Sequence, residues 1–202
     1  MRMDSYLEWA IGDAPKNILV KEVQIEGFTS NLVKGLLNNL LQYEDASYLE
    51  IGVWQGSTFV SALYKNNPKL AVAIDNFSEF GGSEEIFLKN CSQYLTCDYK
   101  LLNHDALSID KSIISTPINI YFYDGYHSEE SQYRAIEYYY DVLADKFILL
   151  IDDWNWEQVK RGTNKVIQNL NLNVEYVVEL PARWNGDEDQ WWNGVYAAVL
   201  KK

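Results

Sequence analysis

Residues 48–58 read YLEIGVWQGST, an apolar run that holds Glu50 and is followed by Gly52 and Gly56. From Phe59 onward, apolar residues recur at helical spacing, so the stretch predicts a strand, a glycine turn and a helix. Glycines let the backbone turn sharply and approach a ligand closely. The start of the helix adds unpaired N–H groups and a partial positive charge. The stretch is therefore typical of a cradle for a nucleotide or a carboxylate.

The spacing of this turn is E-x-G-x-x-x-G, which differs from the G-x-G-x-x-G of dinucleotide-binding folds. The acid stands two residues before the first glycine, and the hydroxyl residues Ser57 and Thr58 follow the second. We expect these residues to belong to a cofactor site. An acidic glycine turn alone is common in α/β proteins, so this interpretation depends on a second motif further along the chain.

Length and charge narrow the class of protein. The 202 residues are 48% hydrophobic and 23% charged, as expected for one α/β domain with a sizeable core. The net charge of −12 repels phosphate backbones, so nucleic acid is not an expected partner. No apolar run approaches the ~20 residues that span a bilayer, and the N-terminus lacks the apolar core of a signal peptide. Cys91 and Cys97 are too few for a disulfide framework, which predicts a cytoplasmic protein without a membrane partner.

Predicted strands and helices alternate along the chain, which indicates a mostly parallel sheet covered on both faces. The expected strands are 48–53, 70–74, 99–102, 118–123, 147–151, 174–180 and 195–200. The expected longer helices are 30–43, 56–64, 83–95, 128–143 and 157–170. We expect a single domain in which residues 1–46 form a helical cap and residues 47–202 the core. Whether the cap covers a ligand or only packs at the sheet edge is open.

Acidic residues follow four successive predicted strands, at Asp75, Asp105, Asp124 and the pair Asp152–Asp153. In open α/β sheets, ligands bind outside the carboxyl ends of the strands. One such acid alone is more simply a helix cap or a turn former, but four strand ends together favour a site. Asp75 lies nineteen residues after Gly56 (75 − 56 = 19), which suits hydrogen bonds to ribose hydroxyls.

The second motif unites the ends of the fourth and fifth predicted strands, which are expected to be neighbours. Asp124, Asp152 and Asp153 would then repel one another unless a cation joined them, and oxygen ligands suit Mg²⁺, Mn²⁺ or Ca²⁺. His127 follows Asp124 by three residues and suits proton removal near neutral pH. The alternative interpretation of His127 is a loop histidine ahead of a helix.

The runs YDGYHS at 123–128 and LIDDW at 150–154, together with the glycine turn, carry a family resemblance. From about residue 30 to 160 the chain resembles class I S-adenosylmethionine (SAM) methyltransferases of the metal-dependent O-methyltransferase branch. The macrocin-type and cephalosporin-hydroxylase-like members are nearest, and catechol O-methyltransferase is more distant. The resemblance implies a Rossmann-like, doubly wound sheet of seven strands, mostly parallel with the last strand antiparallel, and helices on both faces.

The resemblance also implies roles for individual residues. Asp124, Asp152 and Asp153 would bind the metal, expected to be Mg²⁺, and His127 would be the catalytic base beside Asp124. The catechol branch usually has Asn as third ligand and Lys as base, so Asp153 and the absence of Lys at 124–128 favour the macrocin-type comparison. The residues implied to bind SAM are Glu50, Gly52, Gly56, Ser57, Thr58, Asp75, Asp105, Ala106 and Asp124.

The implied function is methyl transfer from SAM to a hydroxyl of a small molecule, either a sugar unit of a glycoside or polysaccharide, or a phenol. Two alternatives stay open. A nucleotide-dependent oxidoreductase would use the same scaffold, but the third glycine of its fingerprint is missing. A non-catalytic cofactor-binding or assembly protein could share the fold, since fold does not fix function, but the full set of acids argues against it.

A polar loop with three tryptophans, residues 183–193, joins the last two predicted strands. Exposed tryptophan beside Asn, Asp and Gln is typical of a platform for a sugar or a planar ring. A contact with another subunit in a homo-oligomer explains the composition equally well. Arg183 at its start either pairs with an anionic acceptor or forms a surface ion pair.

Overall fold

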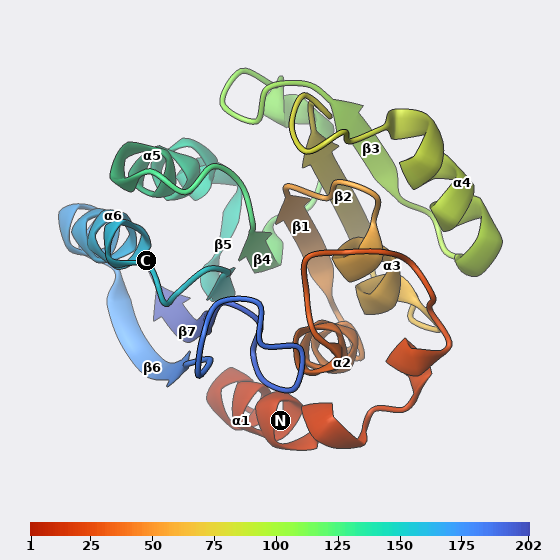
Figure 1. The fold of residues 1–202 in the computed structure, drawn as a ribbon. Helices are drawn as coiled ribbons and strands as arrows, with labels where there is room; N and C mark the ends of the chain where they lie inside the picture. The colour runs from red at the N-terminus through yellow and green to blue at the C-terminus, as the bar shows by residue number, and fades with distance from the viewer.

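A seven-stranded sheet in the order β3-β2-β1-β4-β5-β7-β6 forms the centre of the computed structural model, which describes all of residues 1–202 (Figure 1). Its strands are β1 Ser47–Ile51, β2 Leu70–Asp75, β3 Lys100–Asn103, β4 Ile118–Tyr123, β5 Leu143–Ile151, β6 Asn173–Leu180 and β7 Val195–Lys201. β7 runs antiparallel to both of its neighbours, and the pairs among β1 to β5 are parallel. The predicted fold class is confirmed. β5 begins at Leu143, four residues before its predicted start.

Six α-helices cover the two faces of this sheet (Figure 1). They are α1 Met3–Asp13, α2 Asn31–Leu40, α3 Ser57–Leu63, α4 Glu84–Tyr94, α5 Glu129–Tyr139 and α6 Glu157–Asn169. One core layer joins α1 to α4 to one face, and a second joins α5 and α6 to the other. The inner strands are buried on both faces, which is why their sequences are largely apolar.

Serine side chains begin three of these helices at the predicted positions. Ser30 Oγ accepts a hydrogen bond from Val33 N, and Ser83 and Ser128 do the same for α4 and α5. Each serine satisfies one of the N–H groups that have no partner inside the helix. α3 instead begins directly after Gly56, which adopts a φ of 90°.

The N-terminal helices pack on a face of the sheet rather than at its edge. Two buried amides on α2 hold them: Asn39 Nδ2 donates to the Ala10 carbonyl at 3.0 Å, and Asn38 Nδ2 donates to the Ser61 carbonyl at 2.7 Å. A cavity lies at the carboxyl edge of the sheet, and Phe28, in the segment before α2, is the one residue of 1–46 that lines it. None of the helices is both long and apolar enough to cross a membrane.

Candidate active site

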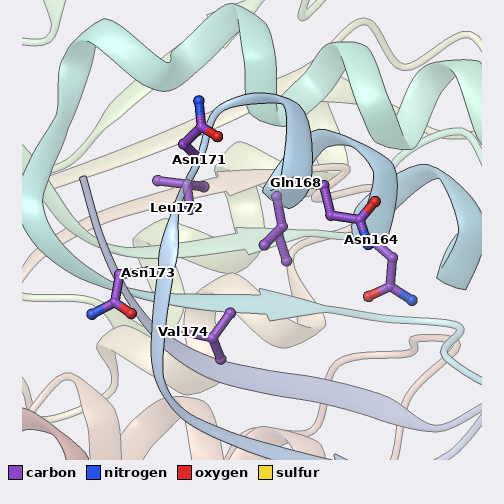
Figure 2. Close-up of a pocket in the computed structure, with 7 residues that line it drawn as sticks. Asn164, Gln168, Asn171, Leu172, Asn173 and Val174 are labelled. Carbon is purple, nitrogen blue, oxygen red and sulfur yellow. The ribbon is translucent and has the colours of Figure 1, made fainter.

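A cavity of about 650 Å³ lies outside the carboxyl ends of β1, β2, β4 and β5. It is lined by 25 residues, which include Gly52, Asp75, Asp105, Ala106, Asp124, His127, Asp152 and Asp153. A second hollow of about 610 Å³, shown in Figure 2, lies around the turn between α6 and β6. Its lining is carboxamide and aliphatic, without a charged side chain, and β6 starts level with the beginning of β5, at the opposite edge of the sheet. The chemistry therefore belongs to the first cavity.

The turn after β1 passes directly against the end of β4. Gly52 has a φ of 86°, and a Cβ there would stand 1.9 Å from the Asp124 carbonyl oxygen. At Gly56, with a φ of 90°, a Cβ would meet the Phe87 ring at 3.0 Å. Gly52 is thus required by the close approach of two backbone segments, and not only by a ligand as its sequence position suggests.

The other sequence-predicted residues of this turn make contacts on its side away from the cavity. Glu50 is fully buried and accepts hydrogen bonds from Tyr48 Oη and Thr58 Oγ1, both at 2.5 Å. Burial raises the pKa of Glu50 to about 7. Ser57 Oγ donates to the Ile25 carbonyl at 3.1 Å. Glu50, Gly56, Ser57 and Thr58 do not line the cavity, so the structure places them behind the turn rather than in the site.

Asp75 and Asp105 lie at one end of the cavity, at the ends of the adjacent strands β2 and β3. Both oxygens of Asp75 accept backbone hydrogen bonds, from Trp54 N at 2.8 Å and from Phe77 N at 2.7 Å. Asp105 is exposed and accepts from Leu107 N at 2.7 Å. Ala106 lines the same end of the cavity.

The acids after β4 and β5 come together at the other end, because Tyr123 and Ile151 are directly paired. Ligand atoms of Asp124, His127 and Asp153 all lie within 4.8 Å of one another. Asp152 is buried, and its Oδ1 has no hydrogen-bond partner. Burial, followed by the neighbouring carboxylates, raises the pKa of both Asp124 and Asp152 well above the usual range.

Asp153 connects the cluster to two other segments. Its Oδ2 lies against His127 Nε2, and its Oδ1 accepts a hydrogen bond from Asn193 Nδ2 at 2.5 Å. The His127 ring packs edge-on against Trp156, with ring centres 4.7 Å apart. Asp153 has a φ of 57°, a left-handed backbone that is uncommon outside glycine and recurs at functional sites.

Comparison with known proteins decides the family. A methyltransferase domain family model matches residues 49–154, more than half of the chain. The chain belongs to this methyltransferase family. A curated relative is an uncharacterized protein of Acanthamoeba polyphaga mimivirus, 24% identical over 144 residues, or 66% of this chain and 65% of the relative. The chain thus spans just under two thirds of that relative.

Solved structures share the fold of this chain at low sequence identity. The O-methyltransferase TomG from Streptomyces achromogenes, in complex with SAM, has a TM-score of 0.58 and 13% identity, over 100% of this chain and 92% of that one. An O-methyltransferase from Bacillus cereus, in complex with S-adenosylhomocysteine (SAH), has a TM-score of 0.58 and 14% identity, over 100% and 93%. TrmN from Thermus thermophilus has a TM-score of 0.59 and 12% identity, over 91% and 52%.

Sequence reasoning missed an aromatic group that lies beside Asp75 in the fold. Phe28 stacks on Trp54 with ring centres 4.8 Å apart, and Phe80 meets Phe28 edge-on at 5.9 Å. Trp54 Nε1 donates to the Phe80 carbonyl at 3.2 Å. The available signal was an aromatic residue in each of two polar, glycine-containing stretches, GFTS and EFGG.

Some side chains of the tryptophan loop, residues 183–193, line the cavity and others lie on the surface. Arg183 forms a bidentate pair with the buried Asp187 at 2.7 and 2.8 Å and lies 4.4 Å above the Trp184 ring. It is therefore engaged within the loop and does not line the cavity. Trp192 and Asn193 do line it, near the acid cluster, whereas Trp184 is exposed.

Proposed function

We propose that the protein transfers a methyl group from SAM to a hydroxyl group of an uncharged small molecule, with the help of a divalent cation. The observation that carries this proposal is one cavity with two different ends. Asp75 and Asp105 stand at one end, and the cluster of Asp124, Asp153 and His127 stands at the other. Family membership supports methyl transfer, and the metal and the acceptor rest on the residues of the site.

The end of the cavity near Asp75 suits the nucleoside part of SAM. Asp75 would accept hydrogen bonds from the ribose hydroxyls, as acids at this place in α/β folds do. Asp105 and Ala106 follow the neighbouring strand, where adenine would lie. Gly52 passes directly against the backbone of Asp124, so the turn after β1 lies beside the acid cluster. SAM bound there would supply an electrophilic methyl group, and SAH would be the second product.

The acid cluster fits a hard divalent cation such as Mg²⁺. Asp124, Asp152 and Asp153 offer only oxygen ligands, and the buried Asp152 Oδ1 has no hydrogen-bond donor in the structure. A cation bound there would lower the pKa of an acceptor hydroxyl. The three residues whose ligand atoms lie within 4.8 Å of one another are Asp124, His127 and Asp153. We nevertheless assign Asp152 as the third ligand, because its buried Oδ1 has no hydrogen-bond partner.

His127 is the group placed to receive the proton of the acceptor. Its side chain is 28% exposed, whereas that of Asp153 is 5% exposed, so the imidazole is the more accessible member of the pair. Asp153 and the edge of Trp156 fix the orientation of the ring. A positioned base of this kind would leave the acceptor oxygen free to form the bond to the methyl carbon.

The charge of the lining supports an acceptor without an anionic group. Six carboxyl side chains and no lysine or arginine face the cavity; they are Asp75, Glu79, Asp105, Asp124, Asp152 and Asp153. Such a lining repels phosphate and carboxylate groups. Tyr126, Trp156 and Trp192 add ring surfaces near the cluster. A neutral sugar unit or a phenol meets both requirements, and a nucleic acid does not.

Calorimetric titration with SAH, NAD and MgCl₂ separately would test this proposal against its alternatives. We expect binding of SAH and Mg²⁺ and none of NAD. Binding of NAD in place of SAH would favour the oxidoreductase, and SAH binding without any methyl transfer to a panel of glycosides and phenols would favour a binding protein.

Cation dependence is tested by chelation and by Asp124→Asn. Turnover measured by radiolabelled methyl transfer should fall to background in excess EDTA and in Asp124→Asn, while SAH affinity is kept. Full activity in EDTA would remove the cation from the proposal and leave the three acids as acceptor contacts.

A further inference from the structure

The end of the tryptophan loop returns to the acid cluster by backbone pairing beyond the ends of β5 and β7. Trp154 N donates to the Gly194 carbonyl at 3.0 Å, and Asn155 N donates to the Asn193 carbonyl at 2.8 Å. Gly194 has a φ of 88°, and a Cβ there would stand 2.6 Å from Asn155 Oδ1. These backbone contacts place the side chain of Asn193 beside Asp153.

Both functions of the Asn193 amide are used. Its Nδ2 donates to Asp153 Oδ1 at 2.5 Å, and its Oδ1 accepts from Gly186 N at 2.7 Å. The other oxygen of Asp153, Oδ2, faces His127. The amide therefore occupies one oxygen of the carboxylate and leaves the second directed into the cluster.

We propose that Asn193 is a positioning residue, which fixes the Asp153 carboxylate so that Oδ2 alone serves the cation and His127. Apart from His127, Asn193 is the only side chain that bonds this carboxylate. Carboxylates that bind a metal are oriented by the hydrogen bonds that they accept, and the Asn193 amide supplies such a bond to Asp153. The inference rests on the proposed function in taking the cluster as the reactive end of the cavity.

The loop has other anchors, so the role of Asn193 can be separated from folding. Arg183 and Asp187 pair bidentately at 2.7 and 2.8 Å, and Trp191 and Trp192 pack against the core layer of α1 to α4. Asn193→Asp keeps the shape of the side chain and the acceptor for Gly186 N, but it removes the donor to Asp153. Asn193→Leu removes the donor without adding charge.

Matched controls come from the same loop. Asn185 is exposed and does not line the cavity, so Asn185→Asp and Asn185→Leu make the same chemical changes away from Asp153. We expect Asn193→Asp to lower kcat by about 10–100-fold, the usual worth of a group that orients a metal ligand, with the KM for SAM within about twofold of wild type. We expect Asn193→Leu to weaken calorimetric Mn²⁺ binding by about tenfold or more. Neither Asn185 variant should change these values.

The Mn²⁺ titration needs no acceptor, so the two proposals fail separately. A wild-type protein that binds Mn²⁺ but transfers no methyl group would contradict the proposed function. Comparison of Mn²⁺ affinity in Asn193→Leu and Asn185→Leu would still decide the role of Asn193. Unchanged Mn²⁺ affinity in Asn193→Leu, equal losses in the Asn185 controls, or no Mn²⁺ binding by wild type would each overturn the positioning role.

Discussion

Two aspartates at the carboxyl ends of parallel strands, Asp75 as the last residue of β2 and Asp152 directly after β5, have opposite surroundings. Asp75 receives a backbone N–H on each oxygen, at 2.8 and 2.7 Å. Asp152 is buried, and one of its oxygens has no donor. Burial and its acidic neighbour raise the pKa of Asp152 well above its usual range. Under the proposed function, the same residue type at equivalent strand ends would bind a neutral, hydroxyl-bearing ligand at one end of the cavity and a cation at the other.

The largest expected effect falls on the cation end. His127→Ala should lower turnover by ~10²–10⁴-fold, because the positioned proton acceptor is lost. SAH affinity, which depends on the Asp75 end, should be unchanged by calorimetry. Mn²⁺ affinity should also be kept if Asp152 is the third ligand. A weaker Mn²⁺ affinity would instead make His127 a ligand, and near-normal turnover would make it a bystander.

The next effect falls on the nucleoside end. Asp75→Ala should weaken SAM binding by ~1.5–3 kcal/mol, the range for hydrogen bonds to a charged group, and it also frees two backbone N–H groups. Calorimetry on the variant, with circular dichroism as a check of folding, measures this loss. Asp152→Ala is the matched change at the other end and should leave SAM affinity unchanged. Equal losses in the two variants would erase the distinction between the ends.

The free energy of unfolding should depend on the charge state of Asp152. The folded pKa of Asp152 is raised above its unfolded value of ~3.9, so its contribution to stability is present below that value and is lost as pH rises through the raised pKa. In EDTA at pH 8, Asp152→Asn should therefore stabilise the protein by ~1 kcal/mol or more. Thermal unfolding at pH 5 and pH 8 measures the gap, and Mg²⁺ should narrow it. A less stable Asp152→Asn at pH 8 would contradict the unfavourable charge.

The smallest effect is expected at Glu50, which is buried like Asp152 but has two hydroxyl donors. Its pKa is raised to about 7. The folded protein therefore loses stability as Glu50 becomes charged, between pH ~4.5 and 7. In Glu50→Gln this pH-dependent loss disappears, but a hydroxyl loses its acceptor, so the net change at pH 8 should stay within ~1 kcal/mol. Denaturant unfolding measures it. A large loss of SAH affinity would restore Glu50 to the cofactor site.

The sequence predicted the sheet and the acids at its carboxyl edge, because both depend on local patterns. A buried parallel strand is an apolar run, and Asp124 and Asp152 become neighbours through strand order alone. The roles of Glu50, Ser57 and Thr58 were not visible, since a glycine turn has residues that face the ligand and residues that hold it from behind. The two groups can be distinguished by their burial, which is known only from the fold.

The contacts between distant segments were also beyond local reasoning. Phe28, Trp54 and Phe80 come from three loops, and no spacing rule joins them. Asn193 reaches Asp153 because β7 lies beside β5 and the pairing continues past both strands. The composition of residues 183–193 indicated a functional loop, but which of its side chains enter the cavity depends on the left-handed turns at Trp192 and Gly194.

The place of β7 also has a consequence for biosynthesis. β7 follows β6 in the chain but lies between β5 and β6, so neither can gain its final neighbour until Val195–Lys201 has left the ribosome. Until then the nascent chain presents the open edge of β5 and a β6 without a partner, and both invite pairing with other chains. Asp152 and Asp153 emerge about forty residues before Asn193 (193 − 153 = 40). Pausing of translation in that interval should therefore favour aggregation, and a chaperone that covers the β5 edge should relieve it.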